Sequence, residues 1–157
     1  ASFKGKFVVL EWNNPNCPFV QKHYVSGNMQ ALHKRSAADS VVWLAVNSTA
    51  NSHPDYMNPQ ELSTWFAKNN ARPDAVLMDT AGDVARAYGA RVTPHMFVID
   101  PSGKLIYAGA IDDKRSSNPA DVKTAFNYVN AALVAARAGR PVEPASTSAY
   151  GCSIKYQ

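Results

Sequence analysis

The chain has 157 residues, 46% hydrophobic and 18% charged, with a formal net charge of +4 at pH 7. This is the length of one domain and the composition of a globular protein, and no apolar run approaches the roughly 18 residues of a membrane-spanning helix. The lysines and arginines stand singly or in pairs, without a basic stripe interleaved with aromatic residues. We therefore expect neither membrane insertion nor a nucleic-acid partner.

The first third of the chain predicts two buried strands with a helical region between them. Residues 6–12 (KFVVLEW) form a β-rich apolar run that ends at two asparagines and a proline. Pro18 suits the first turn of a helix, and residues 19–35 have helical composition with a kink or break expected at the Ser-Gly-Asn stretch 26–28. Residues 41–46 (VVWLAV) predict the second strand.

A long polar loop, residues 47–58, follows the second strand and is either an insertion or a functional loop. Asn58, with Pro59 next and Glu61 at the third position, has the pattern of a capping box. This pattern predicts a helix that runs to about residue 69.

The rest of the chain completes a mixed sheet. The expected elements, in chain order, are a strand at 75–78, a helix at 79–88, a β-hairpin with strands at 95–100 and 104–110, and a helix at 118–138. The resulting order, β-α-β-α-β-α-β-β-α, predicts an α/β domain over residues 1–138. Residues 139–157 then form a tether rich in Pro, Ser and Ala and a C-terminal tail with Cys152.

Cys17 lies between a predicted strand and a predicted helix. Unpaired N–H groups and the positive dipole at a helix N-terminus favour a thiolate, so Cys17 is the candidate nucleophile. Val20 stands where a Cys-x-x-Cys site has its second thiol, and Cys152 is the other cysteine of the chain. A bond between Cys17 and Cys152 would be a structural clasp or a redox-active pair, and pairing of Cys152 with another subunit is a third possibility.

Thr93 and Pro94 directly precede the strand at 95–100. In this topology Pro94 is a candidate cis-proline whose backbone approaches the helix N-terminus that bears Cys17. The alternative is a trans-proline that begins an edge strand. The four histidines are scattered and no Cys-x-x-Cys is present, so we expect no metal, and no nicotinamide or flavin cofactor either.

Three stretches, WNNPNCPFV, VTPHMFVIDPSGKLIYAGAIDD and GCSIKY, resemble in this order the peroxiredoxin-like redoxins of the thioredoxin superfamily, grouped with the alkyl hydroperoxide reductase and thiol-specific antioxidant family. The resemblance implies a thioredoxin-like fold in which Cys17 attacks a disulfide or peroxide beside Pro94, and Cys152 resolves the product. It also places a proton-transferring carboxyl at Glu11, for which burial predicts a raised pKa.

Thr93, Asn14 and Pro18 are the candidate substrate-binding residues around this cysteine. Typical peroxiredoxins carry Thr or Ser three residues before the cysteine and Pro seven before, whereas this chain has Asn14 and Leu10. The resemblance therefore leaves peroxidase and disulfide reductase activity open.

The expected partners are an external thiol donor and a protein disulfide or peroxide substrate. A non-catalytic binding protein for a metal or a partner, with Cys17–Cys152 as a structural disulfide, is the alternative function. The resemblance and the first residue, Ala1, predict a periplasmic or exported protein, with the cytoplasm as the alternative.

Overall fold

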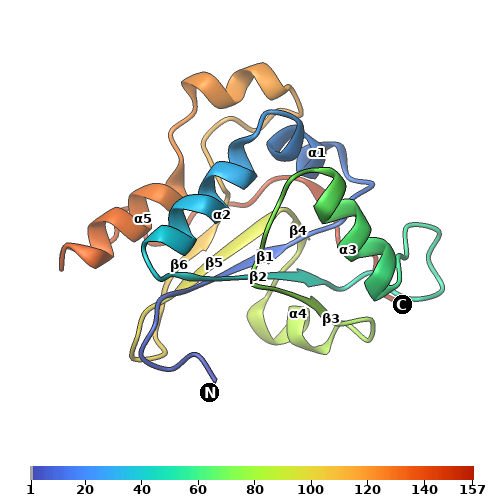
Figure 1. Cartoon of the computed structure of the whole chain (residues 1–157), viewed down its shortest axis with the longest axis horizontal. Coiled ribbons are helices and arrows are strands. Elements are labelled where there is room, and N and C mark those ends of the chain that lie inside the picture. The colour runs from blue at the N-terminus through green and yellow to red at the C-terminus, as the bar shows by residue number, and fades with distance from the viewer. Residues whose placement is uncertain (1) are drawn as a thin grey trace.

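A computed structural model describes residues 2–157 and is built on a five-stranded sheet of order β3-β2-β1-β5-β6 (Figure 1). Its strands are β1 (Val8–Trp12), β2 (Val42–Asn47), β3 (Ala75–Met78), β5 (His95–Ile99) and β6 (Leu105–Gly109). β1, β2 and β3 run parallel, and β5 and β6 are antiparallel to their neighbours. The predicted mixed α/β sheet is confirmed.

Helices cover both faces of this sheet. They are α1 (Pro18–Val25), α2 (Asn28–Ala38), α3 (Pro59–Lys68), α4 (Asp83–Tyr88), the 3-10 helix η1 (Pro119–Thr124) and α5 (Tyr128–Arg137). Side chains of β1 alternate between the faces, so Val9 packs in the core under α1, α2, α3 and α5, while Leu10 packs on the α4 side. Figure 1 shows the four α-helices on one side of the sheet and α4 on the other.

Local signals account for two of the helix boundaries. Gly27 has a φ of 78° and separates α1 from α2, as the predicted break required. The capping box is confirmed at α3, where Asn58 Oδ1 accepts from the Glu61 N–H at 2.9 Å and Glu61 Oε2 accepts from the Asn58 N–H at 2.8 Å.

Two predicted helices are shorter than expected. The helix predicted at 79–88 begins only at Asp83, because the side chain of Asp79 lies before the helix and accepts from the N–H groups of Val84 and Ala85. The helix predicted at 118–138 is divided into η1 and α5, because Asn127 lies in an extended conformation and caps α5 by accepting from the Asn130 N–H.

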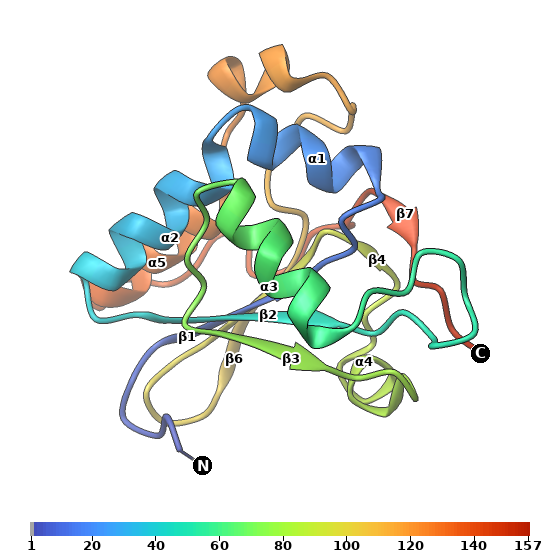
Figure 2. The ribbon, with the colours of Figure 1, turned by 45° about the vertical axis from the view of Figure 1, so that its right-hand side comes forward.

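The segment after α5 lies against the domain and makes hydrogen bonds with it. Ala145 O accepts from the Ala108 N–H at 3.1 Å, so the segment runs beside β6. Thr147 Oγ1 accepts from the Ala110 N–H at 2.9 Å, and a Cβ at Gly109 would collide with Thr147. The segment then pairs as β7 (Cys152–Ser153) with β4 (Val92–Thr93) in a separate antiparallel sheet (Figure 2).

Within residues 2–157 no helix combines the length and the apolar character that crossing a bilayer requires.

Candidate active site

Cys17 occupies the N-cap position of α1. The chain leaves β1, turns through residues 13–16, and is fixed by a hydrogen bond from the Cys17 N–H to Asn14 O at 3.0 Å. Cys17 has an extended conformation, and Pro18 follows as the first helical residue, where its missing N–H costs no helical hydrogen bond. Cys17 therefore lies at the N-terminus of α1, as the sequence predicted, while the N–H groups of Val20 and Gln21 donate to its carbonyl oxygen.

Cys17 is bonded to Cys152, with Cα atoms 6.0 Å apart and a sequence separation of 135. Cys17 is 1% exposed, whereas Cys152 is half-buried. The register of the small sheet places Cys152 opposite Thr93, so the β4–β7 pairing brings the second sulfur to the first. Figure 2 shows β7 beside β4 and close to the start of α1.

The peptide bond between Thr93 and Pro94 is cis, the conformation predicted for Pro94. Thr93 O lies 3.3 Å from Cys17 Sγ, and Thr93 Oγ1 is buried without a hydrogen-bond partner among the described residues. The structure therefore brings four of the predicted site residues together: Cys17, Cys152, Thr93 and Pro94.

Glu11 lies behind this group, fully buried on β1. Its Oε1 accepts from Trp43 Nε1 at 2.8 Å and lies 3.2 Å from His33 Nε2, while its Oε2 accepts from the Tyr24 hydroxyl and from Asn13 Nδ2. Burial by itself raises the pKa of Glu11, but the hydrogen bond and charge of His33 and the hydrogen bonds from Tyr24 and Trp43 together lower it. The predicted raised pKa is therefore wrong: this carboxyl is held as a carboxylate.

The other two predicted site residues, Asn14 and Pro18, lie in the turn itself. Asn14 is 3% exposed, and its side chain is fully engaged within the protein: Oδ1 accepts from the Asn16 N–H, and Nδ2 donates to Asp55 Oδ2 at 3.0 Å. Pro18 is exposed at the start of α1. Asp55 belongs to the long polar loop, which therefore braces the cysteine turn.

A buried polar cluster next to the disulfide was missed by the sequence interpretation. Tyr150 donates to Asp112 Oδ1 at 2.6 Å, accepts from Lys22 Nζ at 3.1 Å, and has its hydroxyl 3.2 Å from His23 Nε2. Burial lowers the pKa of Lys22, raises that of Asp112, and, with the charge of Lys22, lowers the pKa of His23 to about 3. The one signal in the sequence was a tyrosine two residues before the tail cysteine.

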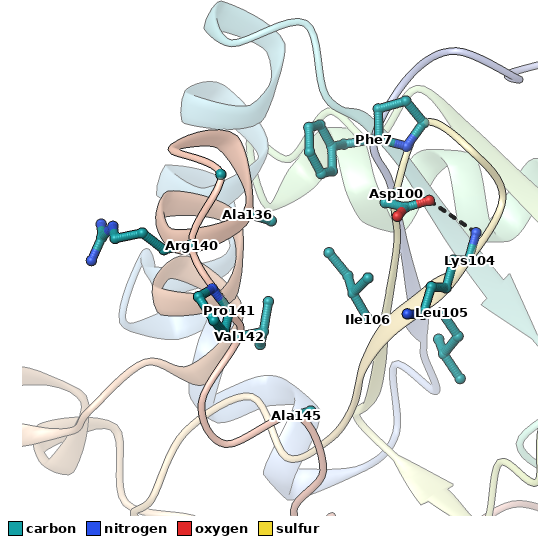
Figure 3. A pocket seen from close by; sticks show the side chains of 12 residues that line it. Phe7, Asp100, Lys104, Leu105, Ile106, Ala136, Arg140, Pro141, Val142 and Ala145 are labelled. Carbon is teal, nitrogen blue, oxygen red and sulfur yellow. Dashed lines mark hydrogen bonds between the residues drawn. The ribbon is translucent and has the colours of Figure 1, made fainter.

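A cavity of about 510 Å³ lies away from the disulfide, between β6 and the segment that follows α5 (Figure 3). Phe7, Ile106 and Val142 form much of its apolar lining, and neither cysteine contributes to it. Among the described side chains, no three His, Cys, Asp or Glu groups converge as metal ligands.

A comparison with models of known protein families shows the family to which this chain belongs. Residues 1–108 match the model of the AhpC/TSA family, which covers Cys17, Thr93 and Pro94 and stops before Cys152. The chain belongs to the AhpC/TSA family. A search of curated proteins finds no match.

Solved structures similar to this AhpC/TSA family member support the fold. An uncharacterized conserved protein from Geobacillus kaustophilus is 27% identical, with a TM-score of 0.81 over 99% of this chain and 80% of that chain. A hypothetical protein from Sinorhizobium meliloti is 24% identical, with a TM-score of 0.77 over 98% of this chain and 81% of that chain. A secreted Mycobacterium tuberculosis disulfide oxidoreductase homologous to E. coli DsbE is 21% identical, with a TM-score of 0.51 over 66% and 69%. The predicted thioredoxin-like fold is thus confirmed.

Proposed function

We propose that this AhpC/TSA protein is a thiol-disulfide oxidoreductase with Cys17 as the attacking thiol and Cys152 as the resolving thiol. The observation that supports this most is the position of the Cys17–Cys152 bond, at the N-terminus of α1 and beside the Thr93–Pro94 peptide. Helix N–H groups stabilise the thiolate that thiol exchange needs both as attacking group and as leaving group.

In the first half of the reaction the enzyme is oxidised and the substrate disulfide is reduced. The Cys17 thiolate attacks one sulfur of the substrate disulfide. A mixed disulfide forms on Cys17, and the other substrate sulfur leaves as a thiolate. The Cys152 thiolate then attacks Cys17 Sγ, which forms the Cys17–Cys152 bond and releases the second substrate thiolate.

An external dithiol returns the enzyme to its starting state. Its thiolate attacks Cys152, because Cys152 is the more exposed sulfur, and Cys17 leaves as a thiolate at the helix terminus. The second donor thiol then closes the donor disulfide and releases Cys152, so two electrons pass from the donor to the substrate. We assign Thr93 and Pro18 as substrate-contacting residues, and Glu11 as a residue that positions α1 through Tyr24.

Hydroperoxide reduction is the second candidate chemistry, supported by membership of the AhpC/TSA family. Attack on a hydroperoxide would give a Cys17 sulfenic acid and an alcohol, and Cys152 would condense with it and release water. We rank it below disulfide exchange, since Leu10 and Asn14 replace the Pro and the Thr or Ser that typical peroxiredoxins carry. Disulfides persist in oxidising compartments, which supports an exported location for the protein.

Two single-cysteine variants test the proposed function. With a small disulfide such as bis(2-hydroxyethyl) disulfide and a dithiol donor, wild type should turn over and Cys17→Ser should not. With the disulfide present and the dithiol left out, Cys152→Ser should accumulate a Cys17 adduct that mass spectrometry detects. If wild type accelerates neither disulfide nor peroxide reduction and Cys152→Ser forms no adduct, the bond is a structural clasp. The deep burial of Cys17 is the observation that favours this alternative.

A further inference from the structure

The tail covers the strand edge that lies next to Cys17. In β7, Cys152 pairs with Thr93 and Ser153 with Val92. An exposed strand edge is the place where an extended peptide adds to a protein as a further strand. In this molecule the chain's own segment takes that place.

The tail approaches this edge closely at Gly151. Gly151 has a φ of 147°, and a Cβ built on it would collide with the carbonyl group of Thr93. A side chain at this position would therefore push the tail away from the peptide group that precedes Pro94.

Before Cys152, the tail is anchored by the Tyr150 cluster. Tyr150 is 5% exposed, and its hydroxyl contacts Asp112, Lys22 and His23. A tyrosine hydroxyl that both donates and accepts in a buried site holds its segment firmly, because Asp112 and Lys22 would otherwise lose a partner away from water.

After Cys152, the tail is anchored by a second group of contacts. The Ile154 N–H donates to Arg91 O at 3.0 Å, the Tyr156 hydroxyl donates to Ala90 O at 2.9 Å, and Lys155 O accepts from the Ala50 N–H at 2.8 Å. Ile154 is also buried in the core on the α4 side of the sheet.

None of these anchoring contacts uses a sulfur atom, so none of them is a bond that reduction itself breaks. We propose that residues 150–156 stay on the β4 edge in the dithiol protein and make Cys17 selective for small disulfides over extended polypeptides. This inference rests on the proposed function of Cys17. A small disulfide reaches Cys17 when the half-exposed Cys152 side chain rotates, whereas an extended chain must first displace β7.

The test uses the full chain with Cys152→Ser, in which Cys17 is the single thiol. One probe is 2,2′-dithiodipyridine. The other is an octapeptide with the sequence AYGCSIKY whose cysteine carries the same thiopyridyl group, so that the two probes share a leaving group. Each rate is divided by the rate of the same probe with glutathione. We expect the normalised rate of the octapeptide to be lower than that of the small probe by about tenfold or more. Tenfold is the factor that results if displacing the tail costs about 1.4 kcal/mol.

Two added substitutions weaken the tail in different ways. Tyr150→Phe removes the hydroxyl and keeps the ring, and Gly151→Ala introduces the collision with Thr93. Each should raise the octapeptide rate about tenfold and leave the small-probe rate within about twofold. Tyr128→Phe, on α5 and outside the tail contacts, is the matched control and should change neither rate. Circular dichroism checks that each variant is folded.

The possible outcomes separate this inference from the function on which it rests. Equal normalised rates for both probes in Cys152→Ser overturn the selectivity, as does an unchanged rate ratio in both folded tail variants. If neither probe reacts with folded protein but both react with urea-unfolded protein, Cys17 is no nucleophile. The proposed function then fails and takes the selectivity with it.

Discussion

Three of the side chains that contact the Glu11 carboxylate come from different elements: Tyr24 on α1, His33 on α2 and Trp43 on β2. The sequence predicted a buried carboxyl at this position, but the predicted direction of its pKa shift was wrong. No local pattern reveals hydrogen-bond donors that lie 13 to 32 residues away in the chain. The position of Cys17 at the start of a helix was easier to predict, since the end of β1 and Pro18 lie close to it in the chain.

The Glu11→Gln variant should be strongly destabilised. A Gln amide places an N–H₂ group where one carboxylate oxygen now accepts, so at least one buried donor of Tyr24 or Trp43 loses its acceptor. Each such loss costs roughly 1–3 kcal/mol. Urea unfolding measures the change, and Glu61→Gln, exposed and still able to cap α3, is the control. A loss below about 0.5 kcal/mol would contradict the structural role of Glu11.

His23 predicts a dependence of stability on pH. Burial and the charge of Lys22 lower its pKa from 6.5 to about 3 in the folded protein. Between these values the unfolded chain binds a proton that the folded protein does not, so the free energy of unfolding falls as the pH decreases from about 6.5 towards 3. The slope from this one group approaches roughly 1.4 kcal/mol per pH unit.

Urea unfolding between pH 4 and pH 8 measures this slope. His23→Gln should show a smaller slope than wild type. Parallel curves for wild type and His23→Gln would show that His23 is already protonated in the folded protein.

The long loop at residues 48–58 and the cysteine turn act as one element, because Asp55 accepts from both Asn14 and Asn16. Asp55→Ala leaves the buried Nδ2 of Asn14 without this acceptor and loosens the turn that presents Cys17. We expect the rate at which Cys17 reacts with a small disulfide to fall about tenfold. This corresponds to an increase of about 1.4 kcal/mol in the activation free energy, because the thiol is less well positioned.

Asp55→Asn keeps one acceptor oxygen and should recover most of the rate, and Asp83→Ala, exposed on α4, is the control. A wild-type rate in Asp55→Ala would show that the loop has no part in presenting the cysteine.

Among the helices and strands, the sequence predicted those whose signals are local, such as α3 with its capping box. The two-residue strands β4 and β7 were missed, since each exists only through pairing with a distant segment.

For the molecule as a whole, the disulfide closes nearly the entire chain into a loop. In the chain-entropy model, a loop of 135 positions stabilises the folded state by up to about 4–5 kcal/mol, through restriction of the unfolded chain. Urea unfolding of wild type with and without dithiothreitol should show this difference. The double variant Cys17→Ser/Cys152→Ser should be insensitive to dithiothreitol, and a difference below about 1 kcal/mol in wild type would exclude a clasp of this strength.

The course of the tail was also not predicted from the sequence. Its Pro, Ser and Ala residues have no periodicity, and the side chains that fix it, Thr147 and Tyr150, act on Gly109 and Asp112 about 40 residues earlier. Composition alone predicted a tether, and it does not reveal these contacts.

The separation of the two cysteines also has a consequence for biosynthesis. At roughly 5–20 residues per second, the ribosome adds Cys152 on the order of ten seconds after Cys17. During that interval the nascent chain carries a thiol whose intramolecular partner does not yet exist, and any encounter with glutathione or an oxidase yields an adduct with another molecule. An exchange reaction must then transfer Cys17 from that adduct to Cys152, and it can occur only after translation has passed Cys152.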